Sequence, residues 1–158
     1  MQLTPSHEVN SPSRVAALED IIECVAPQLL QLVGVARSRL RIYSASAYLK
    51  VTNRASIYAR VHLNRAVAVR YASAPLQPSF AGGAIGVVIS NVDLDVELQG
   101  LGFLARLEAA IWSIPGVEVL EYENVVGDVL MGHIQRRQFH LRNPFDEIPS
   151  YFCLRPEV

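Results

Sequence analysis

The chain has 158 residues, of which 51% are hydrophobic and 18% are charged, and its formal net charge is −1. This length suits one domain with a single hydrophobic core, and the composition excludes a disordered chain. The small net charge gives no reason to expect nucleic acid as a partner. No apolar run approaches the roughly 20 residues that span a bilayer, so no membrane partner is expected either.

The first predicted element is a helix. Residues 1–13 are polar and lack a signal-peptide core, and we interpret them as a flexible N-terminal tail before a single domain over residues 14–158. Apolar side chains recur at spacings of three and four across residues 14–35, which is typical of an amphipathic helix. Pro27 should kink or split this helix because proline lacks a backbone N–H.

Three short strands are predicted next. Residues 56–63 alternate apolar and polar side chains, which is typical of a half-buried strand. Residues 47–52 and 66–71 behave similarly, and the connections between the three segments are short. We therefore expect an antiparallel meander of three strands, followed by a loop rich in proline and glycine over residues 73–83.

The second half of the chain alternates between strands and helices. A long strand is predicted over residues 85–98, with a break or bulge at Ser90 and Asn91. A strand, a helix and a second strand across residues 92–122 imply one parallel, right-handed crossover. The expected fold class is therefore α/β (α+β), a mixed and mostly antiparallel sheet flanked by helices. The remaining predicted elements are helix 100–113, strand 117–122, helix 125–137 and the final strands 139–142 and 151–154.

The cysteines and histidines indicate no special chemistry. Cys24 and Cys153 each lie in an apolar run, so we expect two buried, reduced thiols and no disulfide. Low cysteine usage is typical of a reducing compartment, and a cytoplasmic location is predicted. No histidine has companions at metal-ligand spacing, and no metal site is expected.

The junction between the long strand and the helix after it carries a family resemblance. The segment QGLGFL, Gln99 to Leu104, stands where the GNAT superfamily of acyl-CoA N-acyltransferases has Arg or Gln, two residues, Gly, one residue, and Gly or Ala. Gln99 and Gly102 match the pattern, and Leu104 replaces its last small residue. The order of helices and strands resembles the same superfamily, so the expected sheet is GNAT-like.

A second stretch adds to this resemblance. Residues 123–125, Glu-Asn-Val, are similar to a motif of degenerate GNAT-like proteins encoded by bacteriophages. Residues 136–139 resemble the Arg-Arg-Gly-Phe end of the same proteins, with Gln138 in place of Gly. The resemblance is best over residues 85–158, and it implies the host cytoplasm if the chain is phage-encoded.

The resemblance implies acetyl-CoA or another acyl-CoA as the cofactor. Its pyrophosphate would bind backbone N–H groups where the helix begins, and its pantetheine arm would pair with the backbone near Leu94 and Val96. The first turn of a helix offers unpaired donors, and glycines let a phosphate approach the backbone. In the other interpretation, Gly100 and Gly102 only form a tight turn and Leu104 packs into the core. The predicted binding residues are Leu94, Val96, Gln99, Gly100, Leu101, Gly102, Phe103 and Leu104.

The catalytic residues implied by the family are missing. Ile134 stands where many members have a tyrosine that acts as the general acid. Gly127 stands where the same helix often begins with asparagine. His133 is the candidate substitute, although a neighbour on a helix points about 100° away. The candidate catalytic residues are Glu97, Tyr122 and His133, and Asp95, Glu121 and Glu123 are further candidate bases.

Two functions from different classes remain open. The first is an acyl-CoA-dependent N-acyltransferase that acts on an amine acceptor. The second is a catalytically silent protein of the same fold that binds and modulates a host protein, with Tyr48, Tyr58 and Phe80 as candidate contacts. An open groove between strands that diverge near Val96 and Leu120 favours the first function. A groove filled by Leu104, Phe103 or residues 73–83 favours the second.

Overall fold

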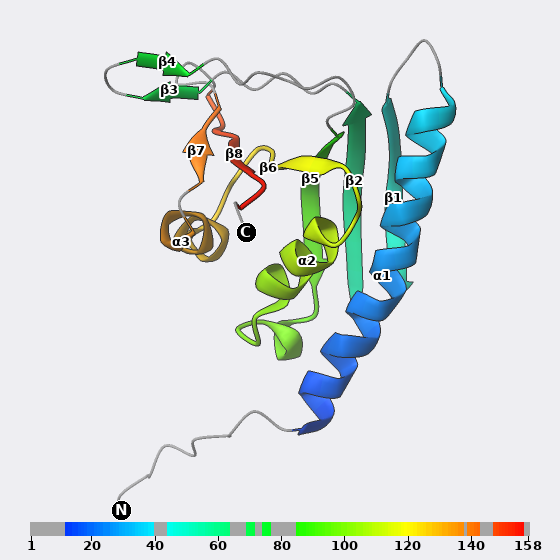
Figure 1. Ribbon diagram of the computed structural model, residues 1–158. Helices are drawn as coiled ribbons and strands as arrows, with labels where there is room; N and C mark the ends of the chain where they lie inside the picture. Colours follow the sequence, from blue (N-terminus) through cyan, green and yellow to red (C-terminus); the bar gives the residue numbers. More distant parts are fainter. Residues whose placement is uncertain are drawn as a thin grey trace, which may run out of the picture.

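The structure, a computed structural model, describes residues 12–39, 44–63, 69–71, 74–76, 85–137, 139–142 and 147–156. These residues form a six-stranded mixed sheet, a separate two-stranded sheet and three α-helices (Figure 1). The order in the large sheet is β1-β2-β5-β6-β8-β7. The predicted fold class is confirmed. The helices are α1 (Pro12–Ser38), α2 (Phe103–Trp112) and α3 (Asp128–Arg136), and the strands are β1 (Ser44–Thr52), β2 (Ala55–Leu63), β3 (Val69–Tyr71), β4 (Ala74–Leu76), β5 (Ile85–Leu94), β6 (Val117–Tyr122), β7 (His140–Leu141) and β8 (Tyr151–Leu154).

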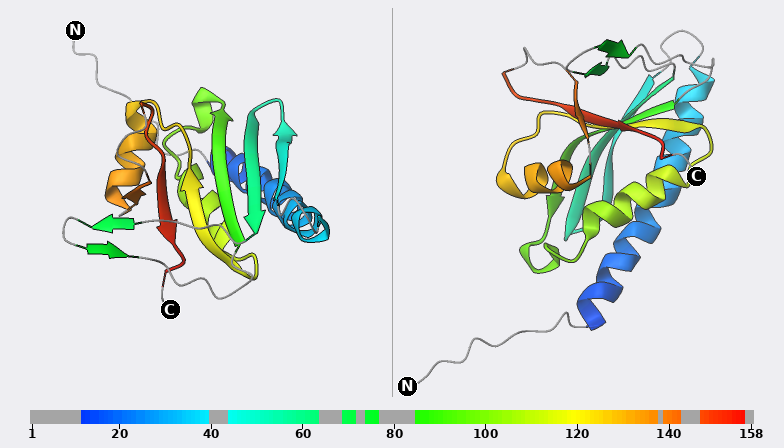
Figure 2. Two further views of the ribbon diagram at one scale, coloured as in Figure 1. Left: turned by 90° about the horizontal axis from the view of Figure 1, so that it is seen from above. Right: turned by 60° about the vertical axis from the view of Figure 1, so that its left-hand side comes forward.

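Helix α1 packs along β1 and β2 and also contacts α2 (Figures 1 and 2). Its predicted apolar stripe is buried except at Val15 and Ile22, which are half-buried. Cys24 lies on the exposed side, so the expectation of a buried thiol was wrong for that residue. Pro27 does not split the helix, which runs unbroken from Pro12 to Ser38. The exposed proline ring points away from the sheet, and the buried side chains on either side of it hold both halves of the helix in place.

The predicted meander is correct for only two of its three strands. β1 and β2 form an antiparallel hairpin across the short turn at Asn53 and Arg54. β3 pairs with β4 in the small sheet, and the second neighbour of β2 is β5. The nine-residue β2 matches β5 along its whole length, and a three-residue strand offers far less burial and hydrogen bonding. Figure 2 shows β3 and β4 set apart from the main sheet.

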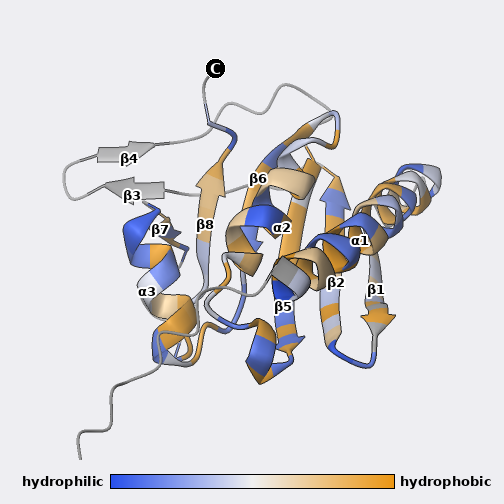
Figure 3. Ribbon diagram, turned by 90° about the horizontal axis from the view of Figure 1, so that it is seen from below, coloured by the Kyte–Doolittle hydropathy of each residue, from blue (hydrophilic) through white to orange (hydrophobic). Residues whose placement is uncertain are grey.

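β5 is the central strand that positions the site. On one side it pairs with β2, and the register shifts so that Tyr58 faces Asn91 while Ala59 faces Ile89. Ser90 is therefore the extra residue of a β-bulge, as predicted. On its other side β5 runs parallel to β6, and α2 forms the crossover between the two strands, which confirms the parallel unit. Figure 3 shows hydrophobic and hydrophilic residues interleaved along α1 and α2, as expected for helices that cover a sheet.

The end of the predicted long strand forms a different structure. β5 ends at Leu94, and residues Val96–Leu98 form a 3-10 turn, η1. Within this turn Leu98 is fully buried and Val96 is 76% exposed, so these two side chains do not share a strand face. α2 then begins at Phe103, three residues later than predicted, and α3 begins at Asp128.

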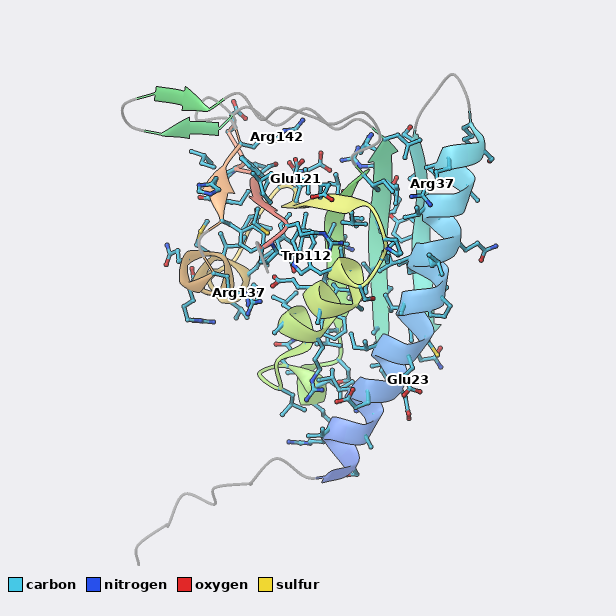
Figure 4. All side chains as sticks on the ribbon, in the orientation of Figure 1. Glu23, Arg37, Trp112, Glu121, Arg137 and Arg142 are labelled. Carbon is cyan, nitrogen blue, oxygen red and sulfur yellow. The ribbon has the colours of Figure 1, made fainter. Side chains whose placement is uncertain are left out.

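Strands β6 and β8 form the other half of the sheet. They pair antiparallel, and β7 lies on the far side of β8. Glu121 on β6 is fully buried and pairs with Arg142, whose Nη1 lies 2.6 Å from its Oε1 (Figure 4). A search of the described residues finds no helix with both the length and the apolar character needed to cross a membrane.

Candidate functional site

The parallel strands β5 and β6 separate part of the way along the sheet. Their pairing runs from Ile85 opposite Val117 to Ile89 opposite Tyr122. The last contact is the N–H of Glu123, which donates to the carbonyl of Ile89 at 3.0 Å. Beyond this point β5 continues to Leu94, whereas β6 ends and the chain turns away. The two strands therefore diverge at the Ser90 bulge, and among the described residues no strand pairs with this edge of β5 beyond Ile89.

A groove of about 600 Å³ fills this divergence. Its size falls within the usual range for small-molecule and cofactor sites. Its walls come from β5, from the loop that leads into α2, from the end of β6 and from α3. The lining residues are Ile89 to Leu94, Gln99, Gly100, Gly102 to Ala105, Tyr122 to Asn124, Val126 to Leu130, His133 and Arg136.

The mouth of the groove is the loop before α2. Gly100 and Gly102 have φ values of 76° and 81°, a left-handed backbone that favours glycine. The first N–H of α2 with an acceptor in the described chain is that of Arg106, which donates to the carbonyl of Gly102 at 3.1 Å. The preceding N–H groups of the first turn, at residues 103–105, are left to bind a ligand or water. The start of α2 therefore presents backbone donors beside the groove.

Leu104 and Phe103 leave this groove open. Leu104 is partly buried and forms part of the wall, and Phe103 is buried against the core. Their packing leaves the volume in front of the loop accessible, which is the arrangement that favours a bound acyl-CoA. The segment 73–83 was a second candidate for filling the groove, and most of it lies outside the described residues.

The predicted binding residues do not all reach the groove. Gln99, Gly100, Gly102, Phe103, Leu104 and Leu94 line it, whereas Leu101 packs against the core and Val96 points to solvent. The carbonyl of Leu94 accepts a hydrogen bond from Nε2 of Gln99 at 3.1 Å, and the carbonyl of Val96 accepts from the N–H of Gln99 at 3.3 Å. Backbone groups near Leu94 and Val96 are therefore partly occupied, and the unpaired edge lies nearer the bulge at Ser90.

A cluster of polar side chains around the buried Glu108 lies beneath the groove, and the sequence did not lead us to predict it. Glu108 on α2 is only 2% exposed. Its Oε1 accepts a hydrogen bond from the hydroxyl of Tyr122 at 3.1 Å and lies 2.6 Å from Nε2 of His133. Its Oε2 lies 2.7 Å from Nε of Arg137, which Figure 4 labels at the end of α3. One signal was available: position 108 falls within the apolar stripe of α2, four residues after Leu104.

Two of the three predicted catalytic residues line the groove. Tyr122 and His133 both line the groove and meet at Glu108. Glu97 is exposed, pairs with Arg54 at 3.2 Å and lies outside the groove. Burial raises the pKa of Tyr122 well above its ordinary value, and the neighbouring Glu108 adds to this effect, so its hydroxyl keeps its proton.

Helix α3 turns His133 toward the groove and Ile134 into the core. Ile134, at the position of the family tyrosine, is 1% exposed. His133 lines the groove and keeps 12% of its side-chain surface exposed. The 100° between neighbouring helical residues therefore brings the histidine to the groove in this chain.

Glu123 stands at the point where the strands diverge. Its carboxylate accepts hydrogen bonds from Ser90, at 2.8 Å, and from Arg60. Partial burial acts to raise the pKa of Glu123, but the hydrogen bonds from Ser90 and Arg60 and the charge of Arg142 outweigh it, so the pKa lies below its ordinary value. The groove therefore contains a fixed negative charge at neutral pH.

The other candidate groups lie apart from the groove. Asp95 bonds Arg54 and the N–H of Glu97 outside the groove. Tyr48 is exposed and stacks on Tyr58 with 4.6 Å between ring centroids, and Phe80 lies outside the described residues. No group of His, Cys, Asp or Glu in the described residues could hold a metal ion.

Comparison with known proteins gives a likeness of fold. No protein family and no curated protein matches the sequence. Among solved structures, the chain is similar to a mutant AtaT toxin bound to the C-terminus of the antitoxin AtaR and acetyl-CoA, with 15% identity, a TM-score of 0.41 and coverage of 78% of this chain and 74% of that chain. AtaTR bound with acetyl-CoA gives 17% identity, a TM-score of 0.40 and coverage of 77% and 75%. At these identities and TM-scores the comparison assigns no family, and the description of the molecule stays that of a mixed α/β domain.

Proposed function

We propose that this protein is an acyl-CoA-dependent N-acyltransferase that binds its acyl donor in the groove between β5 and β6 and transfers the acyl group to an amine. One observation carries the proposal. The parallel strands diverge beside a glycine turn whose helix presents backbone N–H donors, so a groove and an anion-binding helix start share one opening.

The residues present fit such a donor. A Cβ added at Gly100 or Gly102 would meet no atom within 4 Å, so the turn is open on the side where a phosphate would approach. Arg136 adds a positive charge to the groove wall. The unpaired edge of β5 near Ser90 offers backbone groups to an extended amide-containing arm. An acyl-CoA would supply an acyl group activated as a thioester.

The groove also suits an amine acceptor. Glu123 stays ionised there, and its carboxylate, which Arg60 also contacts, can accept a hydrogen bond from an amine. Attack on a thioester requires an uncharged amine, so an acceptor that arrives as an ammonium ion first releases one proton to solvent. Exposed residues of α3, among them Asp128 and Val129, line part of the groove, which leaves room for the acceptor beside the donor.

Binding of acetyl-CoA and CoA is the first test, measured by calorimetry. We expect both to bind, and we expect Gly102→Asp to weaken binding at least tenfold because it places a carboxylate beside the phosphate donors. Gly116→Asp is the matched control. Gly116 lies away from the groove and has a φ of 83°, close to the 81° of Gly102, so the two variants share the backbone strain. A Cβ at Gly116 also meets Nη2 of Arg37 at 3.2 Å and Cδ1 of Ile85 at 3.4 Å, so circular dichroism first checks that this variant is folded.

Two results would contradict the proposal. One is the absence of heat with either ligand at millimolar concentration. The other is equal weakening by the two aspartate variants, since this would assign the effect to strain. Either result favours the alternative of a catalytically silent protein that binds a protein partner.

A further inference from the structure

The buried cluster at Glu108 connects three elements beneath the groove. Glu108 comes from α2, Tyr122 from β6 and His133 from α3, and Arg137 follows the end of α3. Glu108 itself does not line the groove, whereas Tyr122 and His133 do. The carboxylate is thus covered by the two side chains that a groove ligand would meet first.

The hydrogen bonds fix the form of His133. Oε1 of Glu108 accepts a hydrogen bond from the hydroxyl of Tyr122, and Oε2 pairs with the guanidinium of Arg137. Both contacts are those of an ionised carboxylate, which accepts hydrogen bonds. A carboxylate can only accept, so the contact of 2.6 Å requires that Nε2 of His133 carry the hydrogen. In the neutral ring, Nδ1 is then the acceptor nitrogen. A carboxylate that holds one ring nitrogen and leaves the other free is the arrangement that orients a general base.

A buried carboxylate requires an opposite charge and further hydrogen-bond donors, and Arg137 supplies the charge at 2.7 Å from Glu108. The tyrosine and the histidine add two further donors, both from side chains that line the groove. The buried carboxylate of Glu108 is therefore connected by hydrogen bonds to two side chains of the groove wall.

We propose that Glu108 and His133 form the acid–base pair of the groove, with His133 as the catalytic residue and Glu108 as its positioning residue. This inference rests on the proposed function. Nδ1 of His133 accepts the proton that the attacking amine nitrogen loses as it forms a bond to the acyl carbon. The same nitrogen returns that proton to the sulfur as the carbon–sulfur bond breaks. An amide and a free thiol result, and the ring ends in its starting form.

The test combines turnover with the ring form of His133. Thiol release from acetyl-CoA is followed with spermidine and with a lysine-containing peptide as acceptors. We expect His133→Gln to lower kcat about a hundredfold or more, with less than a threefold change in KM for acetyl-CoA. Free imidazole should restore part of the activity of His133→Ala. His140→Gln on β7 is the control and should keep full activity.

Glu108→Gln tests the positioning role without emptying the site. The amide of this variant can donate a hydrogen bond to Nε2 of His133, which moves the ring hydrogen from Nε2 to Nδ1. We therefore expect kcat to fall while the fold is retained. Nitrogen NMR of the free protein should show the hydrogen of His133 on Nε2 in the wild type and on Nδ1 in this variant. Circular dichroism confirms that each variant is folded.

The outcomes separate this inference from the proposed function. Turnover that His133→Gln leaves unchanged overturns the acid–base pair while the acyltransferase stands. A hydrogen on Nδ1 in the wild type also overturns it, whether or not the protein binds CoA. If the protein binds CoA but neither acceptor elicits thiol release, catalysis is overturned and the CoA-binding site stands. Absence of CoA binding overturns the proposed function itself.

Discussion

At the scale of single residues, two buried carboxylates explain most of the polar interior. Glu108 and Glu121 expose 2% and 0% of their surface, and each faces an arginine. Removing a charge from water costs several kcal/mol unless partners compensate it, so each carboxylate requires its arginine. For Glu108 the only sequence signal was its place in the apolar stripe of α2, and Glu121 gave none, because an acidic residue in an alternating strand pattern is usually solvated. The partners Arg137 and Arg142 come from distant positions that only folding brings near.

Glu123 gives a prediction about pH. Its pKa lies below the ordinary value of 4.5 in the folded protein, so the unfolded chain takes up the proton first as the pH falls. The stabilisation from its charge is complete above pH 4.5 and declines as the pH falls through the lower folded pKa. Urea unfolding at several pH values should therefore give wild type a larger free energy of unfolding than Glu123→Gln near neutrality. The difference should shrink as the pH falls below 4.5.

The control for this measurement is Glu118→Gln. Glu118 lies on β6, which ends one residue before Glu123, its side chain is 51% exposed and its contact with Arg155 is 4.0 Å. Its effect on stability should be small and should change little with pH. A difference for Glu123→Gln that grows on acidification would refute the assigned direction.

At the scale of elements, the segment after β5 shows where a pattern misleads. Alternation continues from Val92 to Leu98 and predicted one long strand. Asp95 ends the strand because its side chain accepts the N–H of Glu97 at 3.2 Å and bonds Arg54 from the β1–β2 turn. Arg54 lies 41 residues away in sequence from Asp95. The capping arrangement therefore depends on a tertiary contact that no local pattern contains.

The 3-10 turn gives the element prediction. Leu98→Ala should lower the free energy of unfolding by about 2–5 kcal/mol because it leaves a cavity in the core. Val96→Ala in the same turn should change it by less than about 0.5 kcal/mol because Val96 is 76% exposed. Chemical denaturation measures both. Equal effects would indicate that the segment forms the strand that alternation predicted.

At the scale of the whole molecule, one sheet connects the two halves of the chain. α1 covers β1 and β2 and also contacts α2, and Arg106 on α2 pairs with Glu19 on α1. The pairing of β2 with β5 joins the first hairpin to the strand that borders the groove. The strand that borders the groove is therefore held by a strand of the first half, and a single domain over residues 14–158 stays a prediction.

This prediction can be tested through the one tryptophan. Trp112 ends α2 and lies 5.8 Å from the guanidinium carbon of Arg155, so its fluorescence reports on the second half of the chain. Far-UV circular dichroism reports mainly on the helices, of which α1 is the longest. We expect the two urea transitions to coincide. Transitions with separate midpoints would mean that the halves unfold independently.

The sequence by itself determined the fold class, the parallel crossover, the bulge at Ser90 and the glycine turn before α2. These features depend on local periodicity and on backbone conformations that glycine favours. The phage origin and the acyl donor stay predictions from the family resemblance. Tertiary structure alone decided that β2 pairs with β5, that Leu104 leaves the groove open and that His133 meets Glu108. Each of these depends on contacts between residues far apart in the chain, where packing and the burial of charge outweigh local preference.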